Sequence, residues 1–144
     1  MSTRENWQDG HISIFVYSDK WSPGYISDFL GINPTESIEK GTLISRRLNT
    51  FAPRNGWFYQ LEFKELNQTD ETIQQILFLY LKNKEKFDSL TDVEIRLNCY
   101  INSDLAQIGF SISPETAKIL AEVGREMEFF IFSWGGVVDD SNDE

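Results

Sequence analysis

A chain of 144 residues, 40% of them hydrophobic and 14% aromatic, is long enough to bury one core and too rich in apolar surface to be disordered throughout. Its 13 lysines and arginines stand against 23 aspartates and glutamates, and the net charge of −10 argues against nucleic acid as a partner.

The single cysteine excludes an internal disulfide and a zinc site made of several cysteines, and it is typical of a reducing compartment. The opening MSTRENWQDG has no apolar signal-peptide core, and no segment reaches the roughly 18 apolar residues that a membrane span requires. We therefore expect a cytoplasmic protein with no membrane partner.

The segment ISIFVYS, residues 12–18, predicts the first strand. Its two alternating sets are both apolar: one contains Ile12, Ile14 and Val16, and the other contains Phe15 and Tyr17. Apolar residues in both sets indicate an inner strand that is covered on both faces.

A short helix is predicted next. Ser22 and Pro23 supply its N-cap and first-turn proline, and Gly31 fits the left-handed residue that ends it. Residues 29–42 contain two glycines and a lysine, but they do not match a phosphate-binding loop. Such a loop needs Gly-Lys-Ser/Thr in that order, whereas here Lys40 precedes Gly41. We interpret residues 29–42 as the end of a helix followed by turns.

Three further elements follow from hydrophobic spacing. Alternation predicts a strand over 57–64 with one largely polar face and a strand over 93–101, and an apolar stripe predicts a helix over 69–87 between them. Residues 108–112 are expected to be the hairpin partner of the 93–101 strand, with the turn at 102–107.

The last elements repeat the pattern of the first half. Ser113 and Pro114 open a helix that Gly124 closes, and a strand is predicted over 127–134. The order strand, Ser-Pro, helix, Gly thus occurs twice, as in two related ferredoxin-like strand-helix-strand halves.

These elements predict an α+β fold with a mainly antiparallel sheet of about five to seven strands and three helices, one sheet face being covered by helices. We expect residues 1–138 to form a single domain and residues 139–144 to be a solvated acidic tail.

Catalytic and metal-binding patterns are weak. His11 and Cys99 are the only residues of their kinds, and Cys99 belongs to an apolar set, where a thiol is buried and unreactive. The segment Gly-x-Ser-x-Gly is absent, and the acidic tail lacks the turn glycine and distant glutamate of a calcium loop. We predict no catalytic residues, no metal and no cofactor.

Residues 40–54 form a basic loop in an acidic chain. The segment contains Lys40, Arg46, Arg47 and Arg54 and no acid, so its charge is +4 and the rest of the chain carries −10 − 4 = −14. The loop can be an internal electrostatic clamp, or it can bind an anionic ligand or an acidic partner. Trp57 is either the aromatic anchor of such a site or, as we expect, a core residue.

The order of these features resembles the bacterial domain-of-unknown-function 4279 family. The residues that carry the resemblance are Phe29-Leu30-Gly31-Ile32-x-Pro34-Thr35, Lys40-Gly41, Gly56-Trp57 and the Ser-Pro helix before a closing aromatic strand. The resemblance covers residues 11–134. The family brings no established catalytic residues, and it implies an immunity protein beside a toxin system.

We therefore expect a non-enzymatic, protein-binding module, for example an immunity protein whose acidic surface neutralises a basic toxin. The alternative is a small anionic-ligand-binding domain, or an enzyme, that uses Lys40, Arg46, Arg47, Arg54 and Trp57. A third possibility is a homo-oligomer formed through an edge strand or an aromatic surface.

Overall fold

The computed structural model describes residues 8–133. A five-stranded sheet has the order β2-β5-β1-β6-β7, and β3 and β4 form a separate hairpin. The strands are β1 (Gln8–Ser18), β2 (Glu36–Ile38), β3 (Leu43–Ser45), β4 (Thr50–Phe51), β5 (Asn55–Phe63), β6 (Glu94–Ser103) and β7 (Met127–Ser133). The helices are α1 (Pro23–Leu30), α2 (Thr69–Lys82), α3 (Lys84–Ser89) and α4 (Pro114–Val123), with a 3-10 turn η1 (Leu66–Gln68) before α2.

The strand order contains one ferredoxin-like unit. Leaving aside the β3–β4 hairpin, η1 and α3, the chain runs β1-α1-β2-β5-α2-β6. These four strands lie in the order β6-β1-β5-β2, each antiparallel to its neighbours. Helix α4 then carries the chain back so that β7 pairs with β6 in parallel. The predicted α+β fold with a mainly antiparallel sheet is confirmed.

The two predicted Ser-Pro helices have nearly the same ends. Ser22 caps α1 with φ −68° and Ser113 caps α4 with φ −69°, and each hydroxyl accepts a hydrogen bond from a backbone N–H three residues on. Gly31 and Gly124 end these helices in the left-handed region, at φ 69° and 72°. The two strand-helix-strand units differ in their sheet pairing, since β5 separates β1 from β2 whereas β6 and β7 are neighbours.

Two predicted elements are wrong in detail. Residues 108–112 form an extended loop and no hairpin strand, because the seven-residue β7 takes the place beside β6. The loop still contributes Ile108 and Phe110 to the core margin. The helix predicted over 69–87 is divided at Asn83, whose ψ is 19°, and α3 resumes beyond it so that Phe87 stays buried. Hydrophobic spacing alone does not reveal such a break.

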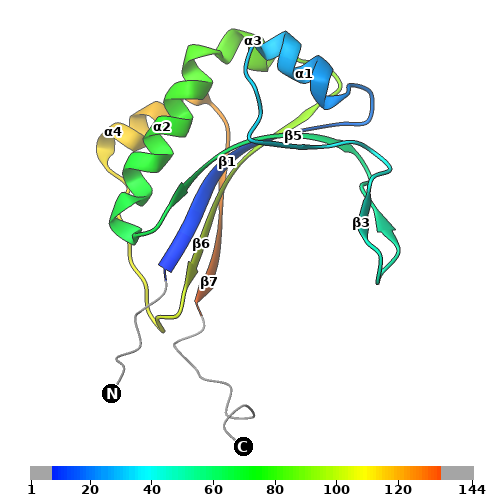
Figure 1. Cartoon of the computed structure of the whole chain (residues 1–144). Helices are drawn as coiled ribbons and strands as arrows, with labels where there is room; N and C mark the ends of the chain where they lie inside the picture. The colour runs from blue at the N-terminus through cyan, green and yellow to red at the C-terminus, as the bar shows by residue number, and fades with distance from the viewer. Residues whose placement is uncertain (1–7, 134–144) are drawn as a thin grey trace, which may run out of the picture.

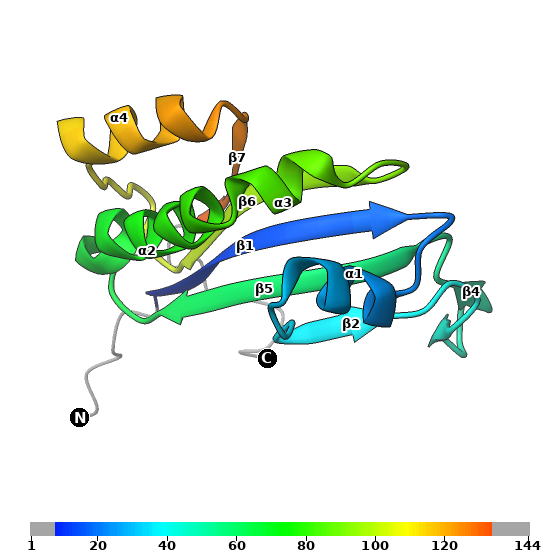
Figure 2. The ribbon, with the colours of Figure 1, turned by 90° about the horizontal axis from the view of Figure 1, so that it is seen from above.

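All four helices lie on one face of the sheet (Figure 1). Viewed from above, α1 lies over the β5–β2 side and α4 lies beside α2 (Figure 2). The core between helices and sheet contains, among others, Ile12, Ile14, Val16, Trp57, Ile73, Ile76, Leu77, Tyr80, Leu97, Cys99 and Ile101, all fully buried. Strand β1 is central, as predicted. The prediction that both of its faces are covered is wrong, because Phe15 and Tyr17 lie on the face opposite the helices and are only half-buried.

A polar network fastens α2 to the start of α4. The Asp70 carboxylate accepts hydrogen bonds from the Ser113 backbone N–H (2.9 Å) and the Thr116 hydroxyl (2.7 Å), and Gln74 donates to Thr116 (2.8 Å). Burial raises the pKa of the Asp70 carboxyl, but the hydrogen bonds from Thr116 and Ser113 outweigh it and leave the pKa lowered.

This network predicts an acid-sensitive contribution to stability. Because the folded-state pKa of Asp70 lies below its unfolded value of 3.8, its stabilisation is present above that value and is lost as the pH falls through the folded pKa. We expect Asp70→Asn to lower the Tm at pH 7 and to lower it less at pH 3, so that the two Tm curves converge in acid. Curves that stay parallel from pH 7 to pH 3 would contradict this role.

Candidate functional site: the open face of the sheet

The sheet face opposite the helices is the strongest candidate site. Within residues 8–133 no helix or strand lies over it (Figure 1). The register brings its side chains together from all five strands, and we call this surface the open face. Its members are Asp9, His11, Ser13, Phe15, Tyr17, Glu36, Ile38, Phe58, Gln60, Glu62, Glu94, Arg96, Asn98, Tyr100, Asn102, Glu128, Phe130 and Phe132.

Aromatic rings run across the open face in contact with one another. Phe58 of β5 meets Phe15 of β1 edge to face, with ring centroids 4.9 Å apart, and Phe15 lies 6.4 Å from Tyr100 of β6. Tyr100 stacks on Phe130 of β7 at 4.9 Å and on His11 at 4.6 Å. Aromatic contacts of this kind are typical of the centre of a binding surface, where large rigid side chains are desolvated at low entropic cost.

A row of charges lies beside these rings. Arg54 donates to Glu94 at 2.6 Å and its guanidinium carbon lies 4.6 Å above the Tyr17 ring, while Arg96 binds the other Glu94 oxygen at 2.8 Å and approaches Glu128 at 3.8 Å. Hydrogen bonds from Arg54, and then from Arg96, lower the pKa of the Glu94 carboxyl. Glu94 is therefore ionised at neutral pH and orients both guanidinium groups.

A pocket of about 420 Å³ opens at the end of the open face next to the β3–β4 hairpin. Residues of β2, the hairpin, β5 and β6 line it: Tyr17, Glu36, Ser37, Ile38, Ile44, Ala52, Pro53, Arg54, Phe58 and Arg96. The hairpin projects beyond the edge of the sheet (Figure 1) and exposes Leu43, Ile44, Leu48 and Phe51 by 41–70%. A larger hollow of about 720 Å³ at the opposite end of the sheet has no aromatic side chain in its lining.

The basic residues predicted as a ligand site are distributed over separate places. Lys40 pairs with Asp19 at 3.6 Å, where both side chains are largely exposed, and Arg54 pairs with Glu94 at 2.6 Å. Arg46 and Arg47 lie exposed in the turn between β3 and β4. Of the set, only Arg54 lines the pocket described above.

Trp57 is a core residue, as expected. It is fully buried, its Nε1 donates to the Ser27 hydroxyl at 3.1 Å, and its ring meets Phe87 edge to face at 6.2 Å. It faces the helices, whereas its neighbour Phe58 faces the open side. Trp57 therefore cannot serve as the aromatic anchor of a ligand site on the open face.

His11 and Cys99 lie on opposite faces of the sheet. His11 stacks on Tyr100, and burial lowers its pKa more than the carboxylates of Glu62 and Asp9 raise it. Cys99 faces the helices, and burial raises its thiol pKa to about 12. A nucleophilic Cys-His pair is therefore excluded by geometry and by the protonated thiol.

Residues 8–133 contain neither a group of metal-ligating side chains nor a membrane-spanning helix. No three His, Cys, Asp or Glu residues in that range are grouped as ligands of a metal ion. None of the helices there is long and apolar enough to cross a bilayer. The predicted acidic tail, residues 139–144, and Trp134 of the last predicted strand lie outside the described residues.

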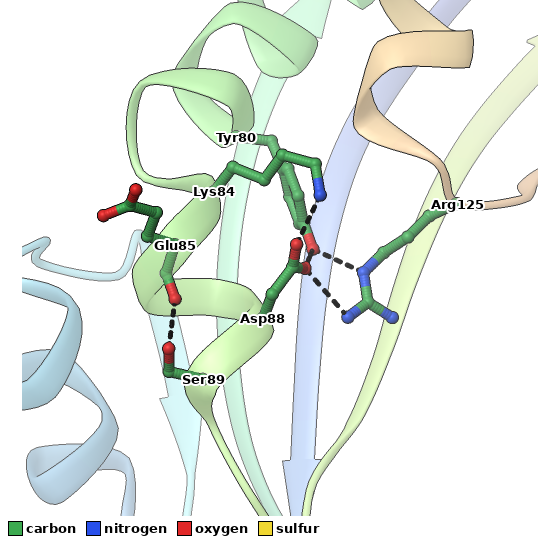
Figure 3. Close-up of polar contacts among 6 residues, drawn as sticks. All are labelled: Tyr80, Lys84, Glu85, Asp88, Ser89 and Arg125. Atoms are coloured by element: carbon green, nitrogen blue, oxygen red, sulfur yellow. Dashed lines mark hydrogen bonds and ion pairs between the residues drawn. The ribbon is translucent and has the colours of Figure 1, made fainter.

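A second polar cluster lies where α2 and α3 meet the segment between α4 and β7. The buried Tyr80 hydroxyl donates to Asp88 at 2.7 Å and accepts from Arg125, and Lys84 also donates to Asp88 (Figure 3). Burial, followed by the Asp88 hydrogen bond, raises the pKa of Tyr80 to about 12. A phenol that stays protonated at neutral pH is no catalytic base, so we interpret this cluster as a structural clamp.

The clamp predicts a measurable loss of stability. Tyr80→Phe removes the hydroxyl and leaves Arg125 and Asp88 each without one partly buried hydrogen bond, so we expect the free energy of unfolding to fall by about 1 kcal/mol. Urea titration followed by circular dichroism measures it. The control is Tyr25→Phe, at a tyrosine that is 41% exposed, and it should change stability by less than about 0.5 kcal/mol. Equal effects of the two variants would contradict the clamp.

The row of aromatic rings on the open face, which we call the aromatic row, was not predicted from the sequence. It consists of Phe15, Tyr17, Phe58, Tyr100 and Phe130. Tyr100 and Phe58 stand in alternating sets that are otherwise polar, next to residues such as Arg96, Asn98 and Gln60. An aromatic residue among the polar residues of a strand could have indicated this surface, because the side chains of a solvent-exposed sheet face are normally polar.

Comparison with known proteins identifies a family. The family model described as "Domain of unknown function (DUF4279)" matches residues 8–133, which is the same span that the structure describes. No curated protein and no solved structure matches the chain significantly.

Proposed function

We propose that this chain, which belongs to the DUF4279 family, is a non-enzymatic protein-binding module that holds a basic protein partner on the open face of its sheet. The observation that carries the proposal is the row of aromatic rings on a sheet face that no described element covers. A partner that buries these rings would gain the hydrophobic stabilisation that the free protein lacks.

The sign of the partner's charge follows from the charges around the rings. The acidic and basic side chains of the open face are Asp9, Glu36, Glu62, Glu94, Glu128 and Arg96, and Arg54 adjoins them, so their formal charges sum to 2 − 5 = −3. The whole chain carries −10. Such a field speeds the association of a positively charged protein and repels an acidic one. An immunity protein that occupies the basic surface of a toxin is one biological form of this function.

No convergent reactive group is found in residues 8–133, and this favours binding over catalysis. The thiol is protonated and lies on the other face of the sheet, and the Tyr80 phenol is held in a clamp. The arginines nearest the pocket are paired with Glu94. The anionic-ligand alternative therefore depends on Arg46 and Arg47, which lie together in the exposed hairpin turn.

Affinity capture from the native host, with the full chain immobilised, tests the proposal. The retained protein is purified, its net charge is established, and its affinity is measured at several ionic strengths. We expect a basic protein whose affinity falls as salt increases, because the interacting charges are partly exposed. An acidic partner, or an affinity indifferent to salt, would contradict the proposal. Loss of binding in Arg46→Ala/Arg47→Ala, with the open face intact, would instead support the anionic-ligand alternative.

A further inference from the structure

The pocket at the base of the β3–β4 hairpin combines rings with one carboxylate that has no ion pair. Within residues 8–133, Glu36 makes no ion pair or hydrogen bond through its carboxylate, and its side chain is exposed in the pocket lining. Across β5 it lies opposite Phe58, so a carboxylate and an aromatic ring stand side by side on one wall. This is the arrangement that holds a cation by charge and by ring contact together.

The two arginines of the pocket do not reverse its sign. Both are bound to Glu94, at 2.6 and 2.8 Å, and Arg96 also lies 3.8 Å from Glu128. Glu94 and Glu128 lie outside the lining but neutralise the two arginines, so the five groups Glu36, Glu94, Glu128, Arg54 and Arg96 sum to 2 − 3 = −1. The charge left over is that of Glu36 on β2, which strands β5 and β1 separate from Glu94 and Arg96 on β6.

One aromatic ring of the pocket, that of Tyr17, already contacts a guanidinium group. Arg54 lies 4.6 Å above Tyr17 within the chain itself. The Phe58 ring lies over Gly56, where a Cβ atom would come within 2.5 Å of the ring and 3.1 Å of an Ile38 methyl. Because Gly56 has no side chain, the Phe58 ring can pack against the strand backbone beside Ile38, and the pocket lies over these two side chains.

We propose that this pocket receives one arginine side chain of the basic partner, with its guanidinium between the Glu36 carboxylate and the Phe58 ring. This inference rests on the proposed function for the identity of the partner, but the pocket can be tested without it. Arginine fits better than lysine, because its planar guanidinium stacks on a ring and binds a carboxylate through two N–H groups. The apolar Ile38, Ile44 and Pro53 would cover its methylene stem.

The test uses three peptides that differ in one side chain, titrated into the full-length protein and followed by NMR. The probes are acetyl-Gly-Arg-Gly-amide, the same peptide with citrulline, which keeps the shape without the charge, and the same peptide with glutamate. We expect the arginine peptide to shift resonances of Tyr17, Ile38 and Phe58 and to bind about tenfold more tightly than the citrulline peptide.

Glu36→Gln should weaken the arginine peptide about fivefold to tenfold, whereas Glu62→Gln, an exposed carboxylate farther along the same face, should not. The Tm of both variants confirms that they are folded. Equal binding of arginine and citrulline, tighter binding of the glutamate peptide, or an unchanged affinity in Glu36→Gln would each overturn the inference.

The captured partner separates this inference from the proposed function. If Glu36→Gln leaves partner binding unchanged while Tyr100→Ala weakens it, the arginine pocket is wrong and the binding face stands. If the arginine peptide occupies the pocket but the captured partner is acidic, the pocket stands and the proposed function is wrong.

Discussion

Replacing Trp57 with alanine will lower the free energy of unfolding by about 3–5 kcal/mol. The side chain is fully buried between the sheet and the helices, and its ring contacts Phe87. Truncation would leave a large cavity under α1 and α3 and would remove the Nε1 hydrogen bond to Ser27. A loss of this size is a large part of the stability of an ordinary domain. Urea unfolding followed by far-ultraviolet circular dichroism measures it.

The control for Trp57 is another aromatic residue close by in the sequence. Phe51 lies on the hairpin and is 53% exposed, so Phe51→Ala should change the free energy of unfolding by less than about 0.5 kcal/mol. A Trp57→Ala protein of normal stability that has lost partner binding would show that Trp57 is a binding residue. The core assignment would then be wrong.

Truncating the rings of the open face will weaken partner binding about 30-fold or more. Tyr100 stacks on both His11 and Phe130, and Phe58 contacts both Phe15 and Tyr17. Each of these two rings therefore contacts two other rings of the open face. Central aromatic residues of interfaces typically cost at least about 2 kcal/mol when replaced by alanine, which is a factor of about 30. Calorimetric titration of Tyr100→Ala and Phe58→Ala with the captured partner measures the change.

Phe78 provides the matched control for these variants. It is an aromatic residue of α2 on the helix side and is 53% exposed. Phe78→Ala removes a similar apolar surface from the other side of the molecule and should leave the affinity within a factor of about two. If Phe78→Ala weakened binding while Tyr100→Ala did not, the partner would bind on the helices.

Local chemistry made much of the fold predictable. Ser22 and Ser113 cap their helices, and Gly31 and Gly124 end them with positive φ, because these residues act through their own backbone and immediate neighbours. The alternation that placed Trp57 and Phe63 on one face of β5 is equally local, since side chains of a strand alternate strictly. These predictions needed no knowledge of the rest of the chain.

The errors concern what lies beside or above an element. Residues 108–112 have the composition of a strand, yet β7 takes the place beside β6, because the parallel crossover through α4 aligns Met127 with Leu97 and Ile131 with Ile101. Apolar residues on both faces of β1 suggested two covered faces, whereas all four helices lie on one side. Strand pairing and layer coverage are tertiary properties, and single-sequence periodicity does not contain them.

The candidate site was predictable only in part. The sequence identified an excess of basic residues in 40–54, and the structure places Arg54 in a pocket but separates it from Lys40 and from the hairpin turn. The aromatic rings of the open face come from four strands, with Phe15 and Phe130 separated by 130 − 15 = 115 positions in sequence, and only the sheet register brings them together.

Hydroxyl-radical footprinting of the complex can show whether the partner covers the open face, because it reports the exposure of individual aromatic side chains. We expect the captured basic partner to protect the open-face rings from oxidation: Phe15, Tyr17, Phe58, Tyr100 and Phe130. Tyr25, Phe29 and Phe78 on the helix side should stay as reactive as in the free protein. Protection of the helix-side residues with an unprotected open face would contradict this expectation.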